Sequence, residues 1–132
     1  MSAVVAIEDA VKRYGALEAL GGVTLALEPG ETVALIGHNG AGKTTLMKLA
    51  LGLIRPEEGV IRVFGANPAG HSGAEIRRRI GFLPESVAFH GAMTGREVLA
   101  FYARLKRAPL FDNDRLLDWV GLGEVARRRV GT

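Results

Sequence analysis

The pattern of apolar and polar positions divides the chain into a β-rich first part and a helical second part. Short apolar runs rich in β-branched residues predict strands over five segments, namely 3–11, 23–27, 32–36, 60–64 and 80–83. Turn signals separate them at Gly21-Gly22, at Pro29-Gly30 and across 56–59. We therefore expect most of residues 1–85 to build a sheet.

Helical patterns occur in both parts of the chain. Residues 43–51 carry few polar side chains beyond the first turn and stop at Gly52, and a short basic helix is predicted near 74–79. Further along, Thr94 and Glu97 have the spacing of a capping box. Behind that box, an apolar face follows i, i+3, i+4, i+7 over Val98, Phe101, Tyr102 and Leu105, and a weaker pattern over 113–120 ends at Gly121. We therefore predict an α/β fold whose helical region covers residues 86–132.

One glycine-rich loop lies between a predicted strand and a predicted helix. Residues 37–44, GHNGAGKT, fit G-x-x-x-x-G-K-[ST] at every fixed position. Gly40 and Gly42 permit backbone conformations in which amides converge on an anion, Lys43 can reach the β- and γ-phosphates, and the Thr44 hydroxyl can bind Mg²⁺. The candidate nucleotide-binding residues are Gly37, Asn39, Gly40, Ala41, Gly42, Lys43, Thr44 and Thr45. We expect ATP and Mg²⁺ to bind here, and no chemical role is assigned to the side chains of His38 and Asn39.

The amino-acid sequence on both sides of the loop resembles that of one protein family. The stretch GHNGAGKTTLMKLALGLIRPEEGVIRVFG is similar to the loop, helix, turn and strand of ATP-binding cassette (ABC) ATPases. The resemblance implies a P-loop fold of ABC type, with an antiparallel β portion, a partial RecA-like core and an incomplete helical subdomain. It also implies that Tyr14 stacks on the adenine ring, for which the alternative is an aromatic that closes the edge of a sheet.

A second family landmark falls at 80–85, IGFLPE, where ABC proteins usually carry a glutamine that contacts Mg²⁺ and the attacking water. This chain has Glu85 instead. A carboxylate can approach Mg²⁺ but cannot donate a hydrogen bond as an amide can. The resemblance therefore assigns Lys43 and Glu85 as the catalytic candidates and Thr44 and Glu85 as the metal candidates, with an exposed loop acid as the alternative for Glu85.

The resemblance also implies partners and a location. The complete protein would pair with a second ATPase subunit and with a transmembrane permease subunit that the helical region contacts. It would then be cytoplasmic and peripheral on the membrane. At finer grain, the segments LPESVAF, MTGREVLAFYARLK and WVGL are similar to the NosF-like ATPase of nitrous oxide reductase copper-site maturation.

Several family parts are missing from these 132 residues, namely the LSGGQ-type signature, the apolar run ending in a Mg²⁺-binding Asp, the general base and the switch His. The segment most similar to the apolar run that ends in Asp is Leu116-Leu117-Asp118, and it has the spacing of a surface helix. We therefore expect a partial domain that binds MgATP weakly at best and does not turn over, with unpaired apolar sheet edges.

Composition and charge agree with this interpretation. The chain has 48% hydrophobic residues and no Cys, and no run of about 18 apolar residues spans a bilayer. Residues 77–132 carry eleven basic and six acidic side chains, including the triplets Arg77–Arg79 and Arg127–Arg129. Nucleic-acid binding is one reading of the triplets, but no aromatics interleave with them and we predict solvated helix faces.

Two further alternatives stay open at this point. A non-hydrolytic nucleotide-binding or assembly module would also use the glycine-rich loop. A P-loop kinase would need a substrate lid and a second acceptor site, and both Tyr14 and the LPE segment at 83–85 favour the ABC reading over it.

Overall fold

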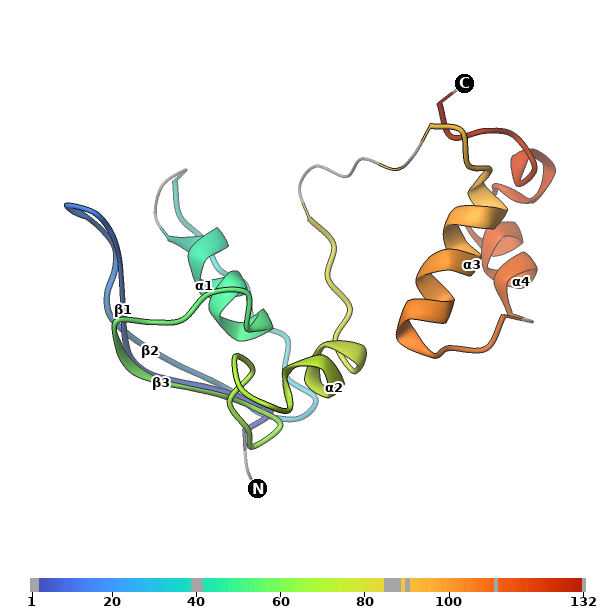
Figure 1. The fold of residues 1–132 in the computed structure, drawn as a ribbon. Coiled ribbons are helices and arrows are strands. Elements are labelled where there is room, and N and C mark those ends of the chain that lie inside the picture. The colour runs from blue at the N-terminus through green and yellow to red at the C-terminus, as the bar shows by residue number, and fades with distance from the viewer. Residues whose placement is uncertain (1–2, 39–41, 85–88, 90, 111, 132) are drawn as a thin grey trace. The chain divides into compact units, whose positions relative to one another are not determined.

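The computed structural model describes residues 3–38, 42–84, 89, 91–110 and 112–131. The chain forms two compact units, Met1–Gly81 (unit 1) and Phe82–Thr132 (unit 2) (Figure 1). The predicted boundary after residue 85 lies outside the described residues and stays a prediction.

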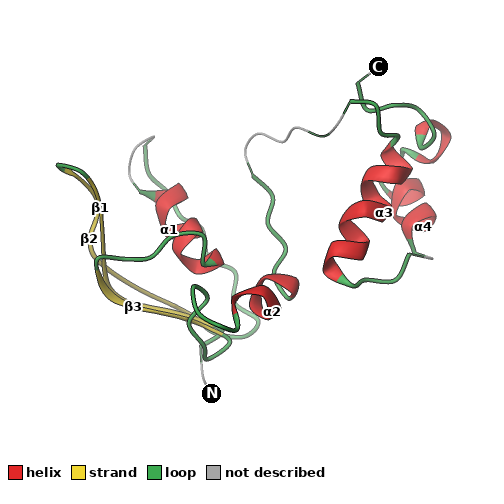
Figure 2. Ribbon diagram, viewed as in Figure 1, coloured by secondary structure: helices red, strands yellow, loops and turns green. Residues whose placement is uncertain are grey.

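Unit 1 contains a three-stranded antiparallel sheet in the order β2-β1-β3 (Figure 2). Its strands are β1 (Val5–Tyr14), β2 (Leu17–Leu27) and β3 (Glu58–Val63). The predicted turn at Gly21-Gly22 is wrong, because β2 runs through both glycines. The register shifts there, with Ala10 opposite Val23 and Val11 opposite Gly21, so Gly22 is the extra residue of a bulge.

Helix α1 (Lys43–Leu51) packs against the sheet and supplies much of its core. The core cluster of buried side chains consists of Ile7, Ala10, Leu20, Leu46, Leu49 and Ile61. The helix ends as predicted at Gly52, whose φ of 75° is left-handed and whose amide bonds back to the last turn. The apolar face of α1 thus joins the segment after the glycine-rich loop to the sheet.

Two predicted strands, 32–36 and 80–83, are wrong, since neither has strand hydrogen bonding in the structure. Residues 31–38 are exposed, and Ile36 is 94% exposed. The side chains of Val33 and Leu35 line an apolar groove of about 180 Å³ beside the sheet and α1. The alternation of apolar residues in 32–36 therefore identifies which side chains face the sheet and α1. A strand also needs a neighbouring backbone to pair with, and within the described residues none pairs with 32–36.

The first arginine triplet lies at the end of α2 (Gly73–Arg78), close to the predicted helix. Arg77 donates hydrogen bonds to the carbonyl oxygens of Leu51 and Pro68, at 3.2 and 3.4 Å. Arg78 pairs with Glu75, and the Arg79 guanidinium lies 3.8 Å from the centroid of the Phe64 ring. All three guanidinium groups thus have contacts within unit 1.

Unit 2 contains α3 (Gly95–Lys106), α4 (Asn113–Trp119) and a short 3₁₀ helix η1 (Gly123–Val125). The predicted capping box is confirmed: Glu97 N donates to Thr94 Oγ1 at 3.1 Å, and Thr94 N donates to Glu97 Oε1 at 3.0 Å. The hydrogen bond from the Thr94 amide holds the pKa of Glu97 below its ordinary value of 4.5. The box therefore fixes where α3 begins.

Backbone pairing closes unit 2 across a long sequence separation. Residues 126–131 run against residues 91–96, with Val130 N donating to Met93 O at 2.7 Å and Arg96 N donating to Ala126 O at 2.9 Å. An antiparallel bridge joins Thr94 to Arg129. We call these two paired segments the strap.

The predicted apolar face of α3 is largely exposed in unit 2. Phe101, Tyr102 and Leu105 are 49%, 46% and 57% exposed, and the two aromatic rings contact each other edge to face at 5.4 Å. In α4, Leu117 is buried while Leu116 and Asp118 are exposed, which confirms the prediction of an amphipathic surface helix there. In the part of the chain that the structure describes, no helix has the length and apolar character of a membrane span.

Candidate nucleotide-binding site

The N-terminus of α1 has the features of an anion-binding helix end. Gly42 precedes the helix with a left-handed φ of 88°, no side chain caps this end, and the first turn carries no acidic residue. The first amides of a helix lack partners inside the helix and carry partial positive charge. This end of α1 therefore suits a phosphate group without any rearrangement of a capping side chain.

Gly42 also lies tightly against β2. A Cβ atom added at this position would lie 2.6 Å from Ala19 O and 2.7 Å from Leu20 Cδ2. These distances leave no room for a side chain, and the positive φ independently favours glycine. The second glycine of the predicted motif is therefore needed where it is, because it lets the helix start next to the strand.

Lys43 bridges the two ends of the glycine-rich loop. Its ammonium group donates a hydrogen bond to the carbonyl oxygen of Gly37. Next to it, the Thr44 side chain is exposed and Thr45 is half-buried. The structure thus brings together Gly37, Gly42, Lys43 and Thr44 at one end of α1. Their role in binding phosphate stays a prediction of the motif.

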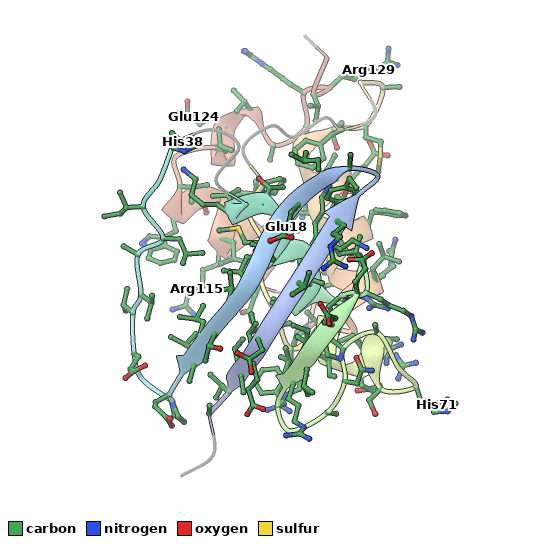
Figure 3. All side chains as sticks on the ribbon, turned by 90° about the vertical axis from the view of Figure 1, so that its left-hand side faces the viewer. Glu18, His38, His71, Arg115, Glu124 and Arg129 are labelled. Carbon is green, nitrogen blue, oxygen red and sulfur yellow. The ribbon has the colours of Figure 1, made fainter. Side chains whose placement is uncertain are left out.

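Four predicted site residues lie outside the described residues. Asn39, Gly40 and Ala41 belong to the loop itself, and Glu85 belongs to the segment 85–88. Figure 3 labels His38, the last described residue of the loop before positions 39–41. The assignments of Asn39, Gly40, Ala41 and Glu85 accordingly stay predictions.

Tyr14 lies at the end of β1, directly opposite Leu17 of β2. Its side chain is 47% exposed. Ala19, which contacts the position of Gly42, is two residues beyond Leu17, or about 7 Å along an extended strand. The hairpin between β1 and β2 therefore places an accessible aromatic ring and the start of α1 on the same stretch of β2.

Two charged residues beside Tyr14 were not singled out by the sequence. Lys12 Nζ lies 5.4 Å from the centroid of the Tyr14 ring and 3.2 Å from Glu57 Oε1. A hydrogen bond from the Arg13 amide, aided by Lys12, holds the pKa of Glu57 below its ordinary value of 4.5. The alternation of side chains along a strand could have placed Lys12 beside Tyr14, but Glu57 is distant in sequence and gave no such signal.

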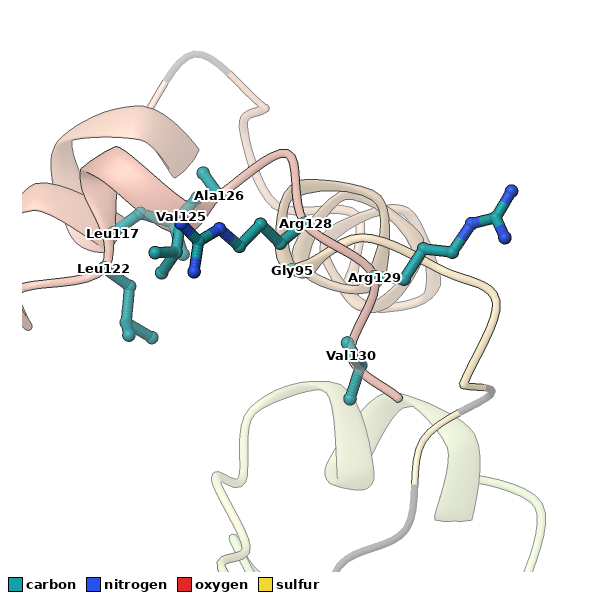
Figure 4. A pocket seen from close by; sticks show the side chains of 8 residues that line it. All are labelled: Gly95, Leu117, Leu122, Val125, Ala126, Arg128, Arg129 and Val130. Carbon is teal, nitrogen blue, oxygen red and sulfur yellow. The ribbon is translucent and has the colours of Figure 1, made fainter. Parts of the chain in front are cut away.

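Unit 2 has a pocket of a different character (Figure 4). It measures about 560 Å³ and is lined by mostly apolar side chains, among them Leu117, Leu122 and Val125, together with Arg128 and Arg129. The nearby helix start is already capped by Thr94 and the strap. This pocket therefore lacks the open helix end that marks the site in unit 1.

Comparisons with known proteins find ABC transporter ATP-binding proteins. A family model described as ABC transporter matches residues 20–132. The chain is 38% identical over 132 residues to the uncharacterized ABC transporter ATP-binding protein YxlF of Bacillus subtilis, covering 97% of this chain and 43% of that protein. It is 34% identical over 135 residues to the bacitracin transport ATP-binding protein BcrA of Bacillus licheniformis, covering 99% and 43%.

A solved structure, described as the ATP binding subunit of an ABC transporter, matches with a TM-score of 0.84 and 30% identity, over 96% of this chain and 54% of that one. The chain thus has the α/β P-loop fold of ABC ATPases, and it spans less than half the length of the two curated relatives. With the family model matched over most of its residues, the chain belongs to the ABC transporter family, among its ATP-binding proteins.

Proposed function

We propose that this chain is part of the ATP-binding subunit of an ABC transporter and that it binds MgATP at the start of α1. The observation that carries the proposal is the uncapped helix end at Gly42, with the Lys43 ammonium group beside it. Because both features favour negative charge, they suit the β- and γ-phosphates of the nucleotide. The chain's membership of the ABC transporter family supports ATP as the nucleotide.

Each predicted residue has a role in this proposal. The backbone of Gly37 and Gly42, together with that of Asn39, Gly40, Ala41 and Thr45, would surround the phosphates, and Lys43 would neutralise their charge. Thr44 would place its exposed hydroxyl on Mg²⁺. The described residues contain no group of three or more acidic, His or Cys side chains fit to hold a metal, so Mg²⁺ would arrive with the nucleotide.

Glu85 and Tyr14 complete the proposed site. Glu85 occupies the family's glutamine position, and its carboxylate would either bind Mg²⁺ or accept a hydrogen bond from the attacking water. Tyr14 would stack on the adenine ring, for which its half-exposed side chain is available. Base–aromatic stacking contributes about 1–3 kcal/mol where it has been measured in single-strand binding.

In the complete protein, we propose that ATP binding and hydrolysis drive a transmembrane permease subunit. Two ATPase subunits would share the nucleotides, and the protein would lie on the cytoplasmic face of the membrane through its permease. Hydrolysis would be phosphoryl transfer to water, in which the protein acts by positioning and charge stabilisation. The NosF-like subtype is a further proposal that rests on the resemblance of three segments of unit 2.

The polypeptide of 132 residues is proposed to bind MgATP weakly and not to hydrolyse it. Its residues include no signature, no Mg²⁺-binding Asp after an apolar run and no general base after such an Asp. Loss of a general base alone slows a reaction by about 10²–10⁴-fold. A phosphate-release rate above background that Lys43→Ala abolishes would contradict this part of the proposal.

Calorimetric titration with MgATP tests the site directly. Lys43→Ala removes a charged contact worth about 1.5–3 kcal/mol, so we expect affinity to fall by roughly 10- to 100-fold. Lys48→Ala is the matched control, because Lys48 lies in the last turn of the same helix and is exposed. Equal affinities for the wild type and Lys43→Ala would exclude the proposed loop site.

The alternative of a non-hydrolytic nucleotide-binding or assembly module shares the same loop. The residues missing from this polypeptide favour that alternative for the 132 residues taken alone. MgATP binding without phosphate release, both in this polypeptide and in the full-length protein, would support it. Phosphate release by the full-length protein would instead support the ATPase.

A further inference from the structure

The side chains around Tyr14 form a connected cluster at the end of the sheet. The Lys12 ammonium group lies 5.4 Å from the Tyr14 ring centroid, donates to Arg55 O at 2.8 Å and lies 3.2 Å from Glu57 Oε1. The Lys12 side chain is only 14% exposed. Since a lysine head group is ordinarily mobile and hydrated, these three contacts hold it in an unusually defined place against the ring.

Glu57 holds the β1 backbone on both sides of Lys12. The Glu57 amide donates to Val11 O at 2.8 Å, and the Arg13 amide donates to Glu57 Oε2 at 2.8 Å. The other carboxylate oxygen, Oε1, meets the Lys12 ammonium group. One residue thus binds the backbone before and after Lys12 and the side chain of Lys12 itself.

We propose that Lys12 and Glu57 are positioning residues for the base of the nucleotide. They hold the Tyr14 ring with the ammonium group against it, so that the exposed part of the ring is ready to stack on the base. The inference rests on the proposed function, because it takes Tyr14 as the residue that meets the adenine. The proposed site then includes the phosphate loop and also the polar cluster of Lys12 and Glu57. This cluster lies at the edge of β1 that faces β3, whereas β2 pairs with the other edge.

Two observations support this assignment. The Tyr14 side chain is 47% exposed although Lys12 lies over it, so part of the ring is available to a ligand. None of the ring pairs found among the described residues involves Tyr14. Immobilising a free side chain on binding weakens affinity, and a ring that is restrained beforehand avoids that loss.

Arg13 provides a matched comparison on the same strand. Its side chain has other partners than the Lys12 side chain. It lies 3.8 Å from Glu18 of β2, which Figure 3 labels, and 3.4 Å from Glu58 of β3. Removing this cation therefore perturbs the charge and the salt bridges of β1 without removing a contact to the ring.

The test compares two ligands by calorimetry on the 132-residue chain: MgATP, which has a base, and inorganic tripolyphosphate, which has none. We expect Lys12→Met and Glu57→Gln to weaken MgATP binding by about two- to tenfold and to leave tripolyphosphate binding unchanged. Lys12→Arg should restore MgATP binding, since it keeps the cation. Arg13→Met should change neither affinity.

Three results would overturn the positioning role. The first is equal weakening of both ligands, which would mean that Lys12 acts on the phosphates or on the fold. The second is an effect of Arg13→Met as large as that of Lys12→Met. The third is an unchanged effect of Lys12→Met in a Tyr14→Leu background, because a residue that acts through the ring has no effect once the ring is gone.

Failure of the proposed function gives a different result. If the wild type binds neither ligand, the phosphate site is absent and the positioning role falls with it. If the wild type binds both ligands and Lys12→Met leaves MgATP binding intact, only the positioning role falls. Far-UV circular dichroism checks that each variant folds, and the pair Lys12→Met and Lys12→Arg decides the question if Glu57→Gln does not fold.

Discussion

The two units of this chain are stabilised in different ways. In unit 1, Ile7 and Leu49 are each 1% exposed and belong to the core cluster of the sheet and its helix. Among the described residues of unit 2, the buried apolar side chains are Ala103, Leu117 and Ala126, which are 6–9% exposed. Unit 1 therefore has a core of large side chains, whereas two of the three in unit 2 are alanines.

In unit 2, hydrogen bonds at defined places stabilise a fold that has few large buried side chains. The capping box fixes the start of α3, and the strap joins residues that are thirty or more positions apart. Its large apolar side chains are mostly outside, and Trp119 is 84% exposed. A small unit that buries little apolar surface depends more on such polar and backbone contacts than a unit with a sheet core does.

The largest expected effect breaks the core of unit 1. Leu49→Ala removes a side chain that is 1% exposed, and we expect the free energy of unfolding to fall by about 2–5 kcal/mol. Urea denaturation followed by circular dichroism measures it. Leu53→Ala makes the same chemical change at a position that is 58% exposed, and it should cost about 1 kcal/mol or less. Similar losses for the two variants would contradict the assigned core.

A smaller effect is expected when the cap of unit 2 is removed. Thr94→Ala deletes the oxygen that accepts from Glu97 N, and this should cost about 1 kcal/mol of local stability. Amide hydrogen exchange of residues 95–106 measures the loss, while protection of β1 should stay unchanged. Thr94→Ser keeps the oxygen and serves as control. If β1 lost protection to the same degree as α3, the two units would not be stabilised separately.

The smallest expected effect concerns pH. Because the pKa of Glu97 is lower in the folded protein than its ordinary 4.5, its charged form stabilises the fold above pH 4.5, and this contribution is lost as the pH falls through the folded pKa. Glu97→Gln should therefore lower the melting temperature slightly at pH 7 and have less effect at pH 3. Thermal unfolding at the two pH values measures this, and a difference that does not change with pH would exclude the carboxylate's role.

Local signals in the sequence predicted the helices better than the sheet. The capping box at Thr94 and the glycine after Leu51 act within a few residues of each other, so they can be recognised from spacing alone. A strand depends on a distant partner, which no local pattern names. For this reason 32–36 and 80–83 were wrong as strands, and Gly21-Gly22 was mistaken for a turn when it is a bulge inside β2.

Contacts around the candidate site could be predicted from the sequence only where the residues are close together in the chain. The motif places Gly37 and Lys43 six residues apart, and the structure joins them by a hydrogen bond. The close approach of Gly42 to Ala19 and the contact of Glu57 with Lys12 involve residues far apart in sequence. Such contacts follow from the register of the sheet, which the alternation of apolar residues does not determine by itself.

The strap also determines how the helices of unit 2 can open. Gly131 N donates to Gly91 O at 3.0 Å, and a Cβ atom at Gly131 would lie 3.1 Å from Gly91 Cα, so the backbones meet at these two glycines. Residues 91–96 and 126–131 are therefore tied to each other, and neither end of the helical segment between them can fray alone. Opening from either end must first break backbone hydrogen bonds of the strap, so these helices should open together as one cooperative unit.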